Sequence, residues 1–170
     1  MGKYLLAIDQ GTSSTRSVLY DDKGRFIDSS QLEFKQYFPQ EGWVEHNPEE
    51  IWESVLSTLG SLVKRNSLVS KDIASIGITN QRETTIVWDK KDGKPIYNAI
   101  VWQDRRTADF CSELNDQTEM VNSRTGLTMD PYFSSTKVNW LLTHVKGARK
   151  RSLAGELLFG TIDSYLIWKL

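Results

Sequence analysis

Apolar, β-prone positions gather in three short runs near the start of the chain: Tyr4–Asp9, Thr15–Tyr20 and Arg25–Lys35. Polar, turn-forming residues separate them, at Gly11–Ser14 and at Asp21–Gly24. Connections this short join antiparallel neighbours, because a parallel pair needs a long crossover. The pattern therefore predicts a three-stranded antiparallel meander.

A longer segment has the spacing of an amphipathic helix. Asn47 is a good N-cap, Pro48 suits the first helical position, and Glu50 completes a box-like start. The apolar residues that follow fall on one helical stripe, which we expect to be core: Ile51, Trp52, Val55, Leu56, Leu59, Leu62 and Val63. Ile73–Thr79 then has the pattern of a short buried strand. Because a helix provides a crossover, this strand can lie parallel to the first, which gives an α/β fold in the order βββαβ.

The pattern divides the chain into three parts. Residues 1–79 form the βββαβ core, residues 80–156 an inserted segment, and residues 157–170 a return to the core. Within the insertion, Thr84–Trp88 and Ile96–Trp102 lie on either side of a polar turn and predict a hairpin.

Two helices are expected in the inserted segment. One runs from Asp104 to about Asn115, and the other begins at a cap formed by Ser134 or Ser135 and stops at Gly147. The stretch between them is polar and contains glycine, so it is expected to be irregular.

The last helix, Ser164–Leu170, has an N-cap in Asp163 but no stop signal. A globular chain rarely ends inside an apolar helix. We therefore expect these residues to be the N-terminal part of a longer protein, truncated before the fold is complete.

Composition excludes several classes of protein. With 21 basic and 22 acidic residues, bulk charge favours neither nucleic acid nor an anionic membrane as a partner. The single cysteine, Cys111, forms no intrachain disulfide and is expected to be a buried small hydrophobe. His46 and His144 have no partners at metal-ligand spacing. No apolar run is long enough for a signal segment or a membrane span, so a cytoplasmic protein is expected.

The first turn carries the residues best suited to chemistry. The first apolar run ends in Asp9, and Gly11 is followed by three short hydroxyl side chains: Thr12, Ser13 and Ser14. Glycine lets the backbone tighten, and N–H groups and hydroxyls that face one way suit a phosphate. The carboxylate of Asp9 suits Mg²⁺, directly or through water. No Gly-Lys-Ser/Thr closes the turn, so it is not a Walker A loop. A plain polar hairpin turn is an equal alternative on the local pattern alone.

Further stretches, taken in order with this turn, resemble the FGGY family of carbohydrate kinases from Tyr4 to Leu170. They are Asp9–Ser14, Gly42–Glu45, Gly77–Thr85, Ile96–Arg106 and Phe159–Asp163, and Tyr132–Trp140 fits the family's first signature. The resemblance implies the ribonuclease-H-like fold of the actin, Hsp70 and sugar-kinase superfamily, with residues 80–156 as an inserted subdomain on the substrate side.

By the same resemblance, Thr12, Ser13, Ser14 and Arg16 bind the phosphates of ATP, and Asp9 organises Mg²⁺. Phosphoryl transfer needs mainly alignment and charge neutralisation, which these groups suit. The family's general base is an aspartate from a later segment. The resemblance thus implies no catalytic residue within these 170 residues, and a chain that is inactive alone.

Within this resemblance, the stretch Asn80–Thr85 implies glycerol, rather than a pentulose, as the acceptor. Arg82 offers donors and Glu83 offers acceptors that match neighbouring hydroxyls. By the resemblance, Trp102 covers the carbon backbone of the acceptor and Tyr132 adds one more hydroxyl. The alternatives are a surface ion pair for Arg82 and Glu83, and simple core packing for the two aromatic residues.

The partners implied are glycerol and ATP, with a homodimer or homotetramer as the assembly of the complete protein. Two other functions stay open. One is a kinase for another polyol or a ketose of the same family, and the other is a non-catalytic remnant that binds nucleotide or a partner.

Overall fold

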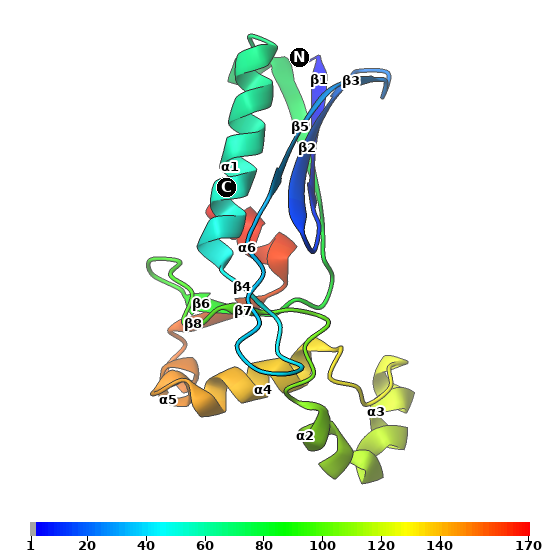
Figure 1. The fold of residues 1–170 in the computed structure, drawn as a ribbon, viewed down its shortest axis with the longest axis vertical. Helices are drawn as coiled ribbons and strands as arrows, with labels where there is room; N and C mark the ends of the chain where they lie inside the picture. Colours follow the sequence, from blue (N-terminus) through cyan, green and yellow to red (C-terminus); the bar gives the residue numbers. More distant parts are fainter. Residues whose placement is uncertain (1–2) are drawn as a thin grey trace. The chain divides into compact units, whose positions relative to one another are not determined.

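The computed structural model describes residues 3–170, which form two compact units (Figure 1). The sheet unit contains the chain up to Lys35, the segment Asn47–Gln81 and the last two residues. The helical unit contains Gln36–His46 and Arg82–Trp168. Within residues 3–170, no helix is both long and apolar enough to cross a membrane.

A four-stranded mixed sheet forms the sheet unit, in the order β3-β2-β1-β5. The strands are β1 (Tyr4–Gln10), β2 (Ser14–Asp21), β3 (Phe26–Glu33) and β5 (Ile73–Asn80). The first three are antiparallel neighbours, and β5 pairs with β1 in parallel. The predicted βββαβ order is confirmed, including the parallel fourth strand. The expected burial of that strand is wrong, because β5 is at the edge of the sheet and residues such as Ile76, which is 43% exposed, face outward.

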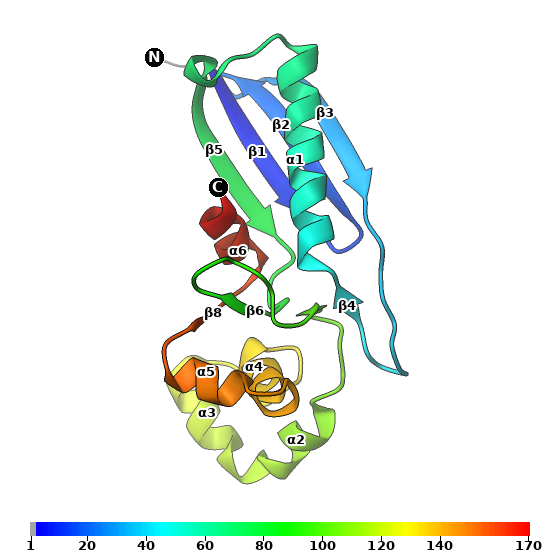
Figure 2. The same ribbon diagram turned by 90° about the vertical axis from the view of Figure 1, so that its left-hand side faces the viewer.

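Helix α1 (Pro48–Arg65) lies across one face of this sheet (Figure 2). The predicted cap is confirmed, since the Asn47 side chain accepts a hydrogen bond from the Glu49 N–H at 3.0 Å. Apolar residues of the helix, the sheet and the connection after α1 pack into one cluster: Leu6, Leu19, Leu62 and Leu68. The predicted stripe is wrong at Leu56, which is 49% exposed because it lies at the edge of the buried face. A short 3₁₀ turn, η1 (Ser70–Asp72), leads into β5.

Two buried hydroxyl pairs join the sheet to α1. The side chains of Thr15 and Ser54 are 2.6 Å apart, and those of Ser17 and Thr58 are 2.8 Å apart. Thr15 and Ser17 are two positions apart on β2 and therefore share the face of the sheet toward α1. Because each of these four buried hydroxyls has a partner, polar groups are satisfied in this interface without any charge.

Two small antiparallel sheets belong to the helical unit. β4 (Glu45–His46) pairs with β7 (Ala99–Ile100), and β6 (Ile86–Asp89) pairs with β8 (Leu157–Gly160). The predicted hairpin is present in part. The chain turns back after β6 and the Ile96 N–H donates to the Val87 carbonyl at 3.0 Å, but only Ala99–Ile100 of the expected second strand is regular.

The helical elements of this unit are α2 (Ala108–Glu113), η2 (Asn115–Gln117), α3 (Thr118–Thr125), α4 (Ser134–His144), α5 (Ala148–Leu153) and α6 (Ile162–Lys169). The expected N-cap of the last helix at Asp163 is wrong, because α6 begins at Ile162 and Asp163 lies within its first turn. The expected start of the first helix at Asp104 is wrong, because that carboxylate binds the Val44 N–H at 2.6 Å instead of capping a helix. The stretch expected to be irregular contains α3, which ends at Gly126 in the left-handed conformation.

The expected caps of α4 are also wrong. Phe133 occupies the N-cap position, without a side-chain hydrogen bond, and Ser134 is the first helical residue. The helix ends before Val145, and Gly147, with φ +77°, precedes α5. Ser134 does not cap the helix, because its hydroxyl binds another segment of the unit.

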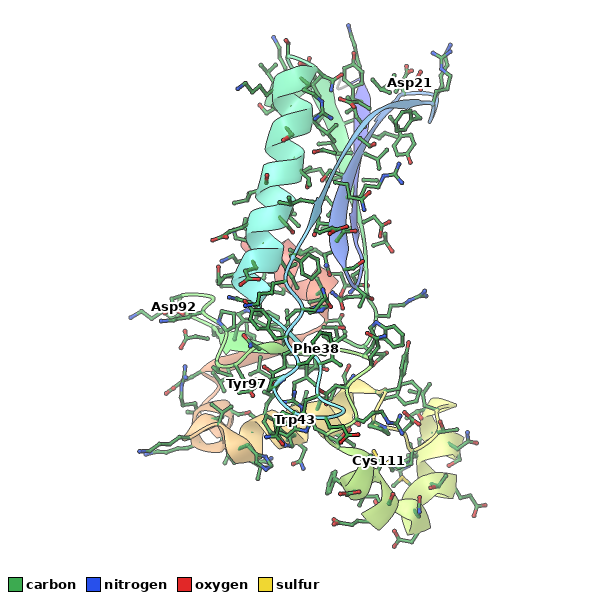
Figure 3. All side chains as sticks on the ribbon, in the orientation of Figure 1. Asp21, Phe38, Trp43, Asp92, Tyr97 and Cys111 are labelled. Carbon is green, nitrogen blue, oxygen red and sulfur yellow. The ribbon has the colours of Figure 1, made fainter. Side chains whose placement is uncertain are left out.

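Arg106 is buried in the helical unit, with a side chain that is 0% exposed. Its Nη2 donates to carboxylates of Glu45 at 2.8 Å and Asp104 at 2.9 Å. The guanidinium carbon lies 3.9 Å from the ring centroid of Trp43, labelled in Figure 3, and 4.6 Å from that of Trp140. We call these five residues the Arg106 cluster. It holds the segment Gln36–His46 against the rest of its unit.

Candidate functional site

The turn between β1 and β2 is closed by its own backbone. The Gly11 N–H donates to the Ser14 carbonyl at 2.9 Å, and a Cβ on Gly11 would lie 3.3 Å from that oxygen. The Phe34 N–H donates to the Ser13 carbonyl at 3.3 Å, which ties the turn to the chain after β3. The Ser14 hydroxyl accepts from the Gln31 amide at 2.9 Å, so its own proton is left to donate to a ligand. The turn is thus tight, and these hydrogen bonds hold the backbone that carries its hydroxyl side chains.

Opposite charges lie beside this turn on one face of the sheet. Asp9 and Arg16 are directly opposite each other in the register of β1 and β2, and both are exposed. Their neighbours Gln10 and Thr15 lie on the other face and are 0% exposed. Side chains paired across strands in this way are close enough to act on one ligand.

The residues present fit a magnesium ion bound together with a phosphate. Mg²⁺ is usually held by one or two carboxylates, with phosphate oxygens and water completing its shell. Asp9 supplies one exposed carboxylate beside the turn. Across residues 3–170, no group of three or more acidic, histidine or cysteine side chains forms an all-protein metal site.

Two buried amides that sequence reasoning missed hold the start of the turn. The Gln81 side chain donates to Gln10 Oε1 at 3.0 Å and to the Gly11 carbonyl at 3.1 Å. The Gln10 side chain donates to the same carbonyl at 2.7 Å. These residues lie at the ends of the parallel strands β1 and β5. Gln10 and Gln81 stand at the ends of two strands that the sequence predicts to be parallel neighbours, and this position was the signal for a contact between them.

Glu83 has an unusual backbone and a well-defined carboxylate. Its φ of +64° is a left-handed conformation shared, among the non-glycine residues the structure describes, only with Ser67. Its Oε2 accepts from the Ser134 N–H at 3.1 Å and from the Ser134 hydroxyl at 2.8 Å. Arg82 is exposed, and within residues 3–170 no ion pair joins it to Glu83. The surface ion pair considered above is therefore not formed.

Trp102 and Tyr132 lie together. Their ring centroids are 6.0 Å apart in an edge-to-face arrangement, and Tyr132 is 36% exposed. The Trp102 N–H donates to the hydroxyl of Thr84, the residue after Glu83, at 3.2 Å. Neither aromatic residue is fully buried, so simple core packing does not describe them. The structure brings Glu83, Trp102 and Tyr132 together, while Arg82 adjoins them only along the chain.

Lys137 connects two of these residues and was missed as a site residue. Its side chain is 0% exposed, and Nζ donates to the main-chain carbonyls of Glu83 at 3.0 Å and Tyr132 at 2.7 Å. Burial lowers the pKa of Lys137 to about 8, and the carboxylates of Asp104, Glu83 and Asp130 oppose that shift. The lysine lies inside the signature-like stretch Tyr132–Trp140, which was the available signal.

A cavity of about 240 Å³ borders the Glu83 carboxylate on the side of α3 and α4. Its wall includes Asp130 and Ser134 and is otherwise largely apolar, with Leu127 and Phe133 among the lining residues. The other three predicted acceptor residues do not line it. Trp102 and Tyr132 contact each other outside this cavity.

Comparison with known proteins gives consistent results. The model for the N-terminal domain of the FGGY family of carbohydrate kinases matches residues 4–170. A glycerol kinase from Sinorhizobium fredii is 59% identical over all of this chain and 35% of its own length. The crystal structure of Plasmodium falciparum glycerol kinase with ADP superposes with a TM-score of 0.90 at 34% identity, over 97% of this chain and 33% of that one.

A gluconate kinase from Lactobacillus acidophilus shares the fold, with a TM-score of 0.83 at 23% identity, over 99% of this chain and 33% of that one. The chain thus spans about a third of the length of the proteins it matches. The predicted fold class is confirmed by these neighbours, which have the ribonuclease-H-like fold of the sugar kinases.

Proposed function

Because the chain belongs to the FGGY family of carbohydrate kinases, we propose that it is the N-terminal part of an ATP-dependent glycerol kinase. The complete protein would transfer the γ-phosphoryl group of ATP to a terminal hydroxyl of glycerol and yield sn-glycerol 3-phosphate. The observation that carries this proposal is the 59% identity to a glycerol kinase across the whole chain. The gluconate kinase, at 23% identity, supports the fold alone.

The turn of the sheet unit would hold the phosphates of the nucleotide. In this proposal Thr12, Ser13 and Ser14 donate to phosphate oxygens, and Arg16 neutralises their charge. Asp9 would hold Mg²⁺, directly or through water. The ion, when bound, neutralises charge on the phosphates and aligns them for transfer.

The helical unit would hold the acceptor. Glycerol carries a hydroxyl on each carbon, so paired donors and acceptors suit it better than an apolar wall does. Arg82 would donate to two neighbouring hydroxyls and Glu83 would accept from them. Trp102 would cover the carbon chain, and the Tyr132 hydroxyl would add one contact. The hydrogen bond from Ser134 to the Glu83 carboxylate supports this role, because a carboxylate held in one orientation can align the substrate hydroxyls that bind it.

The reaction can be tested on the complete protein with a panel of acceptors. We expect kcat/KM for glycerol to exceed that for xylulose or gluconate, measured as acceptor-dependent ADP release. A preference for xylulose or gluconate would favour the alternative of another polyol or ketose kinase.

The chain by itself should not catalyse the reaction, because the general base is expected in a later segment. Glycerol-dependent ADP release above background from residues 1–170 would contradict this. The remaining alternative, a non-catalytic remnant, would be favoured by a stop codon directly after Leu170. An in-frame continuation that carries an Asp-Gln motif would favour the kinase.

An ATP-dependent kinase of this kind would work in the cytoplasm, with glycerol and ATP as its partners. We also propose a homodimer or homotetramer for the complete protein. Sedimentation of the purified complete protein tests the assembly.

A further inference from the structure

Lys137 is placed where a lysine is unfavourable for three separate reasons. Its side chain is 0% exposed, although lysine is almost never fully buried. No carboxylate among the described residues forms an ion pair with it, so its charge is balanced only at longer range. It also lies in the first turn of α4, where the helix dipole disfavours a cation.

We propose that Lys137 is a positioning residue for the acceptor site, which holds the main chains of Glu83 and Tyr132 in one fixed arrangement. The inference rests on the proposed function, because it assumes that Glu83 and Tyr132 bind the acceptor. Lys137 itself does not touch the acceptor in this proposal.

The two hydrogen bonds of Lys137 require a donor at this position, because both partners are carbonyl oxygens. Nζ donates to the Glu83 carbonyl at 3.0 Å and to the Tyr132 carbonyl at 2.7 Å, two oxygens from segments far apart in the chain. A methionine has a similar length and fills the same space without the desolvation cost of an ammonium. It offers no N–H, so both carbonyls would lose their donor.

The backbone at Glu83 explains why such a hold is needed. A non-glycine residue at φ +64° is strained and persists only where its surroundings impose it. Ser134 fixes the Glu83 carboxylate at 2.8 Å, and Lys137 fixes the carbonyl of the same residue. Together they hold both the side chain and the main chain of Glu83, and so fix the direction in which its carboxylate points. The contact with Tyr132 then sets the second segment relative to the first.

The test compares Lys137→Met with Lys146→Met in the complete protein. Lys146 is exposed beyond the end of α4 and serves as the matched control. We expect Lys137→Met to raise the glycerol KM at least about tenfold, because small displacements of positioning groups cost one to two orders of magnitude. The KM for ATP should stay within twofold of wild type. Lys146→Met should leave both KM values unchanged.

A second measurement does not depend on activity. Amide hydrogen exchange should rise in the peptides covering Arg82–Thr85 and Asp130–Ser134 in Lys137→Met, and not in Lys146→Met. If Lys137→Met does not yield folded protein, Lys137→Gln is measured by the same criteria. Its amide nitrogen lies one bond closer to the main chain and cannot reach both carbonyls, so the same increases in the glycerol KM and in exchange are expected.

The outcomes separate the two proposals. If wild-type protein phosphorylates no glycerol, the proposed function fails, and the exchange data still decide whether Lys137 holds both segments. If the glycerol KM of Lys137→Met lies within twofold of wild type, or if exchange does not change in the two segments, the inference is overturned. An equal rise in the KM for glycerol and for ATP would also overturn it, since that is the result of a general structural defect.

Discussion

The two units bury polar groups of different kinds. In the sheet unit, the buried polar side chains are hydroxyls and amides, such as Thr15, Ser54 and Gln10. The helical unit also buries the hydroxyls of four threonines, but it adds ionisable groups, which are Glu45, His46, Asp104 and Lys137, together with the side chain of Arg106. Neutral pairs form between neighbouring elements at low cost, whereas buried charges are stable only when every partner is in place. We therefore expect the helical unit to be more sensitive to single substitutions than the sheet unit.

The largest effect is expected at Arg106. Arg106→Leu leaves the carboxylates of Glu45 and Asp104 buried without their cation, and breaking a buried pair from one side costs about 3–5 kcal/mol. The measurement is denaturant unfolding of the complete protein, followed by tryptophan fluorescence.

Arg105→Leu is the matched control for that experiment. Arg105 is the adjacent residue, and its ion pair with Asp130 is 3.3 Å long with both side chains at least 40% exposed. Exposed pairs contribute about 0–1 kcal/mol, so this variant should unfold close to wild type. Equal losses in Arg105→Leu and Arg106→Leu would show that the Arg106 cluster does not stabilise the unit.

A second prediction separates the proposed roles of the two units in catalysis. Arg82→Ala removes a charged donor to the acceptor, so the glycerol KM should rise by about 10- to 100-fold, with a smaller change in kcat. Thr12→Val removes a hydroxyl proposed to bind the transferred phosphate, so kcat should fall by about tenfold with little change in the glycerol KM. Steady-state kinetics of the complete protein measures both. If both variants lost only glycerol affinity, the phosphate role of the turn would be wrong.

The same contrast explains which parts of the molecule the sequence predicts. The strands, α1 and the cap at Asn47 follow from residues close together in the chain, and these predictions are confirmed. The start of α4 was wrong because the Ser134 hydroxyl binds Glu83, a partner 51 positions away. Lys137 lies in the signature-like stretch, but it was missed as a site residue because its contact with the Glu83 carbonyl joins residues 54 positions apart. The roles of the predicted site residues stay predictions until the kinetic tests above are made.

A third prediction concerns acid. Burial lowers the pKa of His46 to about 4 from its ordinary value of 6.5. Between these values the unfolded chain binds the proton and the folded chain does not. His46 therefore lowers stability as the pH falls from 6.5 toward 4, by about 2 kcal/mol at pH 5. His46→Gln should reduce the decrease in Tm of the complete protein between pH 7 and pH 5. An unchanged decrease would show that the histidine does not contribute to it.

The smallest effect is expected at Gln81, where the sheet unit holds its turn with neutral amides. Gln81→Met removes the donors to Gln10 and to the Gly11 carbonyl, but that carbonyl keeps its hydrogen bond of 2.7 Å from Gln10. One neutral hydrogen bond contributes about 1 kcal/mol, so the KM for ATP should rise by about fivefold while the glycerol KM stays the same. Gln103→Met, at an exposed position, is the control. Gln81→Met is also unfolded with denaturant. If it lowered the free energy of unfolding as much as Arg106→Leu does, a neutral pair would be as indispensable as a buried charge, and the contrast between the two units would not hold.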